Sequence, residues 1–121
     1  MIYKVTATIT TDASGDATVY LGTTLRGRVH AIKYTKGTLD AGTDLVITGE
    51  TTGVAILTDS PSDTEWYYPR AFPNAVTTGA AGTVATEDVH VLEERIKVVV
   101  AQGGNAGVGS IEAYIDAPSP Y

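Results

Sequence analysis

Apolar and polar residues alternate one by one along most of this chain. The pattern is clearest near the N-terminus, in the run Tyr3, Lys4, Val5, Thr6, Ala7, Thr8, Ile9 and Thr10. Successive side chains of a β-strand point to opposite faces, so this alternation is typical of a strand with one buried face. Because the alternation recurs as far as residue 116, it predicts a chain built almost entirely of strands.

Turn residues divide the chain into short predicted strands. The Asp, Ser and Gly cluster at 11–16 is typical of a turn, and we expect it to join the first two strands in a hairpin. The predicted strands cover residues 3–10, 17–21, 25–34, 44–48, 54–58, 89–101 and 110–116. A short helix over 87–95 is an alternative, although the β-branched residues there favour a strand.

Short strands separated by frequent turns are typical of a sandwich, a jelly roll or a barrel. A chain of 121 residues corresponds to one domain, large enough to hold a core without disulfides. We therefore predict an all-β fold over residues 1–121, an antiparallel, jelly-roll-like sandwich.

Residues 59–87 differ from the rest. Pro61, Pro69 and Pro73 each remove a backbone donor and restrict φ, so a continuous strand or helix is not expected. The segment also contains Trp66, Tyr67, Tyr68 and Phe72, and aromatic residues argue against simple disorder. We predict a long loop that folds over its own sheet or over a neighbouring molecule.

Composition excludes several classes of function. The net charge is −6, and nucleic-acid affinity depends on Lys and Arg, so we predict no nucleic-acid partner. The chain has no cysteine and no apolar run near the length of a membrane span. Charge is uneven, since residues 1–36 hold five basic residues against two acidic ones. This unevenness indicates either an ordinary solvated surface or a bipolar one that docks a complementary surface.

The candidate metal ligands are sparse. His30 and His90 lie far apart in the sequence, and a metal site usually needs three or four convergent ligands. The acid pairs in 12–16 and 40–44 each flank a glycine turn, but a calcium loop needs six to eight oxygens. We interpret these pairs as hairpin turns and predict neither a metal nor a cofactor.

No pattern of catalytic residues is visible. Glu93 and Glu94 are adjacent, so on a strand they would point to opposite faces and could not form a catalytic dyad. We expect them at a solvated edge or in an ion pair between subunits. The glycine-rich run at 103–109 lies between two strands, whereas a phosphate-binding loop precedes a helix, so we predict a flexible hairpin loop. The chain is predicted not to be an enzyme.

Two segments remain as candidate contact surfaces. Residues 66–72 combine aromatic side chains with an arginine, the types enriched at interface hot spots. The alternative is that these aromatics cap the core. The basic strand at 25–36 is the second segment. The candidate interface residues are Arg26, Arg28, Trp66, Tyr67, Tyr68, Arg70 and Phe72.

Several stretches together resemble a known group of proteins. They are Arg26-Gly27-Arg28-Val29, Ile32-Lys33-Tyr34, Asp44-Leu45-Val46-Ile47-Thr48, Tyr68-Pro69-Arg70-Ala71 and the run from Arg95 to Asn105. In this order they resemble small all-β head proteins of tailed bacteriophages, of the capsid cement or decoration type. The resemblance implies a sandwich, in some members a jelly roll, and it supplies no catalytic residues.

The resemblance implies a structural protein on the capsid surface of a virion, made in the bacterial cytoplasm. Its partner would be the major capsid protein, and we expect a homo-oligomer, dimer or trimer, with no membrane partner. One alternative is a tail or head–tail connector component. Another is a carbohydrate-binding sandwich in which Trp66, Tyr67 and Tyr68 form a stacking platform.

Overall fold

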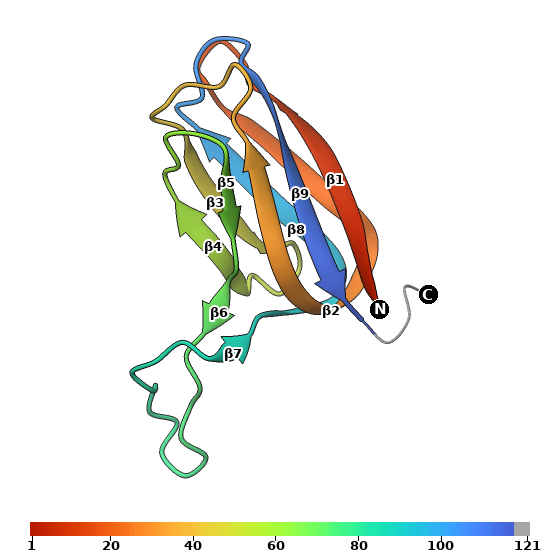
Figure 1. Ribbon diagram of the computed structural model, residues 1–121, viewed down its shortest axis with the longest axis vertical. Coiled ribbons are helices and arrows are strands. Elements are labelled where there is room, and N and C mark those ends of the chain that lie inside the picture. Colours follow the sequence, from red (N-terminus) through yellow and green to blue (C-terminus); the bar gives the residue numbers. More distant parts are fainter. Residues whose placement is uncertain (118–121) are drawn as a thin grey trace.

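The computed structural model describes residues 1–117, and within that range every regular element is a β-strand (Figure 1). No helix among these residues is long and apolar enough to cross a membrane. The strands are β1 Ile2–Thr10, β2 Ala17–Thr35, β3 Asp44–Gly49, β4 Ala55–Asp59, β5 Glu65–Tyr67, β6 Arg70–Ala71, β7 Glu87–Asp88, β8 His90–Ala101 and β9 Val108–Asp116. The predicted antiparallel all-β sandwich is confirmed.

One long strand, β2, belongs to both layers of the sandwich. Its residues 17–28 pair with β8, and its residues 28–35 pair with β9. In Figure 1 it descends in the rear layer, turns at the lower end and rises in the front layer. The front layer therefore has the order β1-β9-β2-β5, and the rear layer has the order β2-β8-β3-β4.

A glycine is required where β2 changes layer. Gly27 has a φ of +134°, and a Cβ at this position would lie 2.6 Å from the carbonyl oxygen of Asp116. An L-residue other than glycine rarely adopts such a backbone conformation. The strand bends here because this residue alone lets β2 and β9 approach so closely.

The core lies between the two layers. Its fully buried large side chains come from strands of both layers and from the loop before β3. They are Ile9, Leu21, Val29, Ile32, Tyr34, Leu39, Leu45, Ile47, Val91, Ile96, Ile111 and Ile115. Burying each aliphatic side chain of this set stabilises the fold by roughly 1.5–3 kcal/mol, so this core holds the two layers together.

The predicted pairing of the first two strands is wrong. β1 pairs with β9, from Ile2 opposite Asp116 to Thr10 opposite Val108, and not with β2. The predicted strands at 17–21 and 25–34 are one strand with a register shift. The turn itself is as expected, since the Asp12 carboxylate accepts the N–H groups of Ser14 and Asp16 at 2.8 and 3.0 Å. It connects two layers because local turn chemistry does not choose the pairing partner.

The glycine-rich run at 103–109 is also not a hairpin loop. β8 and β9 do not pair with each other, and the run crosses from one layer to the other. Thr11 ties it down, because its hydroxyl donates to the Gly104 carbonyl at 2.6 Å and accepts the Gly107 N–H at 2.8 Å. The helix alternative for 87–95 is wrong, since β8 begins at His90.

The long segment at 59–87 is largely a connection, as predicted, but it contains three short strands. β5 adds to the front layer by pairing with β2, with Trp66 opposite Lys33. β6 and β7 form a separate two-stranded ladder. Beyond them, the chain leaves the sandwich and projects away from it (Figure 1). One part of the segment therefore covers its own sheet, as predicted, and another part projects away from it.

Candidate functional site: a protruding arm

Residues 70–88 form an extension that we call the arm. At its base, Arg70 pairs with Asp88 and Ala71 with Glu87. Farther out, a bridge joins Asn74 to Ala81. The tip is closed by backbone hydrogen bonds from Ala75 to Ala80 at 2.8 Å and from Gly79 to Ala75 at 2.7 Å. The arm is thus a hydrogen-bonded hairpin with its own defined shape.

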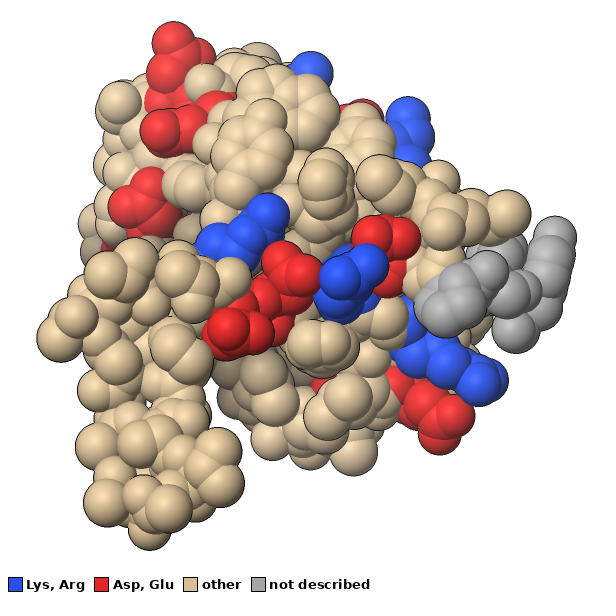
Figure 2. All heavy atoms as spheres, turned by 60° about the horizontal axis from the view of Figure 1, so that its bottom comes forward, with Lys and Arg blue, Asp and Glu red and all other residues tan. Residues whose placement is uncertain are grey.

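The outer part of the arm is uncharged and carries exposed apolar side chains. Residues 71–86 contain no Asp, Glu, Lys or Arg. Phe72 and Val84 are 53% and 65% exposed, and Val76 at the tip is fully exposed. Figure 2 shows this part as a projection without a charged side chain, beside a body that carries both signs. Exposed apolar groups gathered in one place on a folded protein are typical of an interaction site.

A chain of ion pairs links the base of the arm to the body. The Asp88 carboxylate forms ion pairs with Arg70 Nε and with one Arg28 nitrogen, both at 3.4 Å. Arg28 also contacts Asp116 of β9 at 2.8 Å. The backbone N–H of Val29 donates to the Val89 carbonyl at 2.8 Å, which holds β2 against the start of β8. Each exposed ion pair contributes only about 0–1 kcal/mol to the free energy of unfolding. These pairs therefore affect the direction of the arm relative to the sandwich more than they affect stability.

The three arginines proposed from the sequence therefore have partners within the chain. Arg28 and Arg70 belong to the ion pairs at the base of the arm. Arg26 lies 3.5 Å from Glu93 and is exposed. The charges of these three arginines are therefore partly offset by neighbouring carboxylates, whereas Lys33 and Lys36 of the same basic strand form no ion pair with the described residues.

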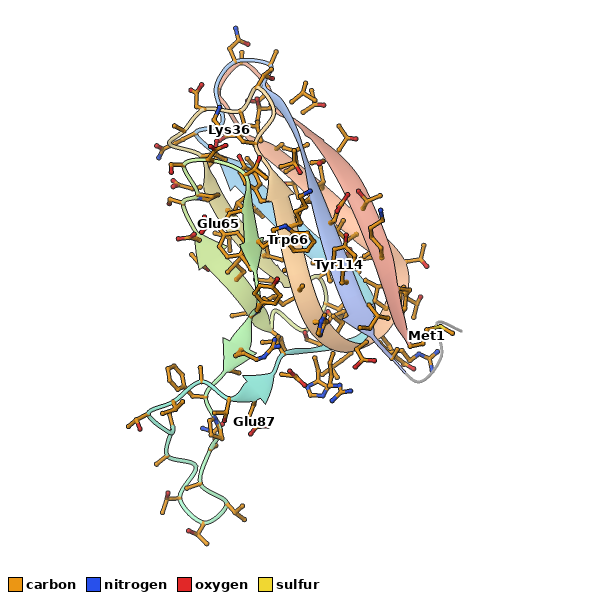
Figure 3. All side chains as sticks on the ribbon, in the orientation of Figure 1. Met1, Lys36, Glu65, Trp66, Glu87 and Tyr114 are labelled. Carbon is orange, nitrogen blue, oxygen red and sulfur yellow. The ribbon has the colours of Figure 1, made fainter. Side chains whose placement is uncertain are left out.

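The aromatic residues proposed as one platform point in different directions. Trp66 lies on the outer face of the front layer, with its ring centroid 5.5 Å from that of Tyr114 and the rings tilted by 32° (Figure 3). Lys33 Nζ lies 5.5 Å from the same indole. Tyr68 is 61% exposed, close to the base of the arm. Tyr114 was missed because nothing in the sequence indicates that β5 and β9 flank the same strand.

Tyr67 faces inward and packs against the core. Its hydroxyl donates to the Asp59 carboxylate at 2.6 Å, which joins the two layers at their edge. Burial first, and then the carboxylates of Asp59 and Glu65, raise the pKa of this phenol. Trp66, Tyr67 and Tyr68 therefore do not form one stacking platform.

Glu94 is a buried carboxylate, whereas the sequence predicted a solvated edge or an ion pair between subunits. It accepts the N–H groups of Thr51 and Thr52 at 2.7 and 2.8 Å, and the Thr52 hydroxyl at 2.7 Å. These bonds, the Thr52 hydroxyl first, lower the pKa of Glu94. Its neighbour Glu93 is exposed and adopts a φ of +57° at a register shift of β8. Glu94 therefore anchors the β3–β4 turn.

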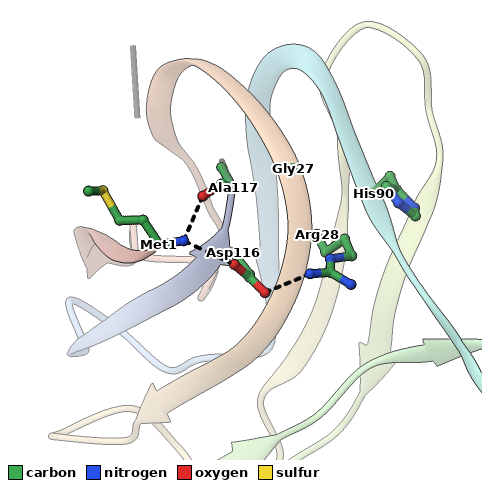
Figure 4. A pocket seen from close by; sticks show the side chains of 6 residues that line it. All are labelled: Met1, Gly27, Arg28, His90, Asp116 and Ala117. Carbon is green, nitrogen blue, oxygen red and sulfur yellow. Dashed lines mark hydrogen bonds and ion pairs between the residues drawn. The ribbon is translucent and has the colours of Figure 1, made fainter. Parts of the chain in front are cut away.

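The histidines are exposed and lie apart from the arm tip. His90 lines an open hollow of about 480 Å³ with Arg28 and Asp116 (Figure 4). In this hollow Arg28 and Asp116 bind each other, so both charges are already engaged. Within residues 1–117, no three His, Asp or Glu side chains are grouped closely enough to hold a metal ion.

Comparisons with protein-family models, with curated proteins and with solved structures find no match to this chain.

Proposed function

We propose that this protein is a structural component of a tailed-phage virion that binds the outside of the capsid shell and stabilises it. The observation that carries the proposal is the uncharged arm with exposed apolar side chains that projects from the sandwich. The proposed partner is the major capsid protein. The resemblance of the sequence to phage head proteins supports the same conclusion.

The shape of the arm suits docking onto a large surface. Its exposed Phe72, Val76 and Val84 would lose water on contact, which is favourable by roughly 25 cal/mol per Å² of apolar area. The hairpin is already hydrogen-bonded, so binding requires little ordering. Many copies on a symmetric shell add their contributions, so a modest interface for each copy is sufficient for stable attachment.

The first test measures attachment to particles. Capsid particles of the encoding phage, purified without this protein, are mixed with the wild type or with a variant in which Asn-Gly replaces residues 72–86. The two-residue turn preserves the pairing of β6 with β7. We expect the wild type to co-sediment with particles and the shortened variant to stay in solution. Absence of the wild-type polypeptide from mature virions would contradict the proposal.

A matched pair of point variants separates the arm from the body. Val76→Asp introduces a charge at the fully exposed tip, where no packing is lost. Val54→Asp makes the same change in the β3–β4 turn, where the valine is 37% exposed. We expect Val76→Asp to weaken co-sedimentation at least about tenfold, since a buried unpaired charge is costly, and Val54→Asp to bind like the wild type. Equal binding of both variants would contradict docking through the arm.

The Trp66–Tyr114 pair favours a second candidate function, carbohydrate binding. An exposed indole beside a phenol ring can stack on the apolar face of a sugar. If this function is correct, glycan-array binding is lost in Trp66→Ala and kept in Phe72→Ala. Wild-type protein that binds no glycan would count against it.

A further inference from the structure

The first strand of the protein has an open edge. β1 is hydrogen-bonded to β9 along its full length, and no strand within residues 1–117 pairs with its other side. Figure 1 shows it at the border of the front layer. The N–H and C=O groups on a free edge form a template for another strand.

Apart from one lysine, β1 lacks the features that usually protect such an edge. It contains no proline, its register with β9 has no bulge, and its single charge, Lys4, lies on the outer face. The other edges are less suitable. β5 has three residues, β4 has five and a register shift, and the first half of β2 is interrupted after Leu21. β1 is therefore the one long, regular edge among the described strands.

Burial along β1 indicates that its inner face is incomplete. Tyr3, Val5 and Ala7 point toward the core but are only partly buried. The corresponding residues of the adjacent β9, Ile111, Ala113 and Ile115, are completely buried. An additional strand beside β1 would cover the exposed parts of the three β1 side chains.

We propose that β1 pairs antiparallel with β1 of a second copy, around a two-fold axis at Thr6. In this register all nine residues of the strand are paired, with Thr6 opposite Thr6. Val5 lies opposite Ala7 of the second copy, and Tyr3 lies opposite Ile9. Lys4 lies opposite Thr8, so no like charges meet. The symmetric register centred on Lys4 would place two ammonium groups together and pair fewer residues.

This pairing makes a closed dimer with one continuous sheet across both front layers. The contact is isologous, because the same strand is used by both copies, and it leaves no open β1 edge for further growth. It is separate from the arm, so it stands or fails independently of attachment to a shell.

Cysteine cross-linking tests the register directly, because the protein has no cysteine of its own. In Thr6→Cys, the two thiols face each other across the axis, with Cα atoms about 4.5–5.5 Å apart, within disulfide range. In Thr8→Cys, the two thiols are four residues apart along the strands, about 14 Å, which is too far. On mild oxidation we expect a covalent dimer from Thr6→Cys and none from Thr8→Cys.

A mixture provides the positive control for the second position. Position 8 of one copy lies opposite position 4 of the other in the proposed register. Mixing the Thr8→Cys and Lys4→Cys variants therefore yields a cross-linked heterodimer, although neither variant alone gives a covalent dimer. Equal cross-linking of Thr6→Cys and Thr8→Cys, or none in any sample, would overturn the register.

A charge at the axis tests the dimer without cross-linking. Thr6→Lys places two ammonium groups opposite each other at the axis. In the control Thr10→Lys, the new lysine lies opposite Ile2 of the second copy. Both positions are exposed on the outer face. By analytical ultracentrifugation we expect the dimer dissociation constant to rise at least about tenfold in Thr6→Lys and to change little in Thr10→Lys. A wild type that remains monomeric at millimolar concentration would refute the proposal.

Discussion

At the scale of single residues, the adjacent Glu93 and Glu94 occupy opposite environments. Glu93 is exposed and pairs with Arg26, and Glu94 is buried under the β3–β4 turn. A buried carboxylate is stable only if its oxygens are hydrogen-bonded, and Glu94 binds two backbone N–H groups and a hydroxyl. Its charge is therefore part of the structure of this turn.

This environment predicts a pH-dependent stability. The pKa of Glu94 lies below its ordinary value of 4.5, so its contribution is complete above about pH 4.5 and is lost as pH falls through the lowered pKa. We expect Glu94→Gln to lower the melting temperature by several degrees at pH 7. The difference from the wild type should shrink below pH 4.5, as measured by calorimetry across pH.

The neighbouring substitution is the control. Glu93→Gln removes a charge from an exposed side chain on the same strand. We therefore expect little change in melting temperature at pH 7 or below pH 4.5. A Glu94→Gln variant as stable as Glu93→Gln at pH 7 would contradict the role assigned to the buried carboxylate.

At the scale of elements, the arm is held to the sandwich at its base only. Asp88 is shared between Arg70 of the arm and Arg28 of β2, so one carboxylate connects the two parts. The rest of the arm has its own backbone hydrogen bonds. The outer arm therefore depends on its own hairpin hydrogen bonds, and its contacts with the sandwich are confined to the base.

Removing this shared carboxylate is expected to loosen the arm. In Asp88→Asn, both ion pairs are lost, but the free energy of unfolding falls by only about 1 kcal/mol or less because the groups are partly exposed. Amide hydrogen exchange at 70–88 should become faster while exchange in β8 and β9 stays unchanged. Glu93→Gln, which breaks an exposed ion pair outside the arm, is the matched control. Unchanged exchange in the arm of Asp88→Asn would show that the ion pairs do not restrain it.

At the scale of the whole molecule, the first and last strands lie side by side. Ile2 pairs with Asp116, and the bent β2 joins both layers. Nearly all strand pairings therefore connect distant parts of the sequence. Such pairings require long loops to close before any contact is gained, which makes folding slow.

This topology predicts slow, two-state folding. By stopped-flow fluorescence of Trp66, we expect refolding in the range of milliseconds to seconds. Thr6→Cys kept reduced should refold at nearly the wild-type rate, since Thr6 is exposed on an edge strand. Refolding in microseconds would contradict the dominance of long-range pairing.

The alternation of apolar and polar residues already determined where most strands lie and which of their faces is buried. Periods of two at 3–10, 44–48 and 110–116 identify strands and their inner faces, because the backbone of a strand imposes that period wherever it lies. The prolines and aromatics at 59–87 likewise mark the segment that contains the arm. The sequence also shows that residues 71–86 carry no charge, but it does not show that these residues are exposed.

Only the tertiary structure decided which strands pair and what each polar group contacts. The turn at 11–16 is the same whether β1 pairs with β2 or with β9, so local chemistry could not exclude the wrong hairpin. Trp66 meets Tyr114, and Glu94 meets Thr52, across long sequence separations. Such contacts depend on the order of strands in the sheet, which arises from packing of the whole core and not from any one segment.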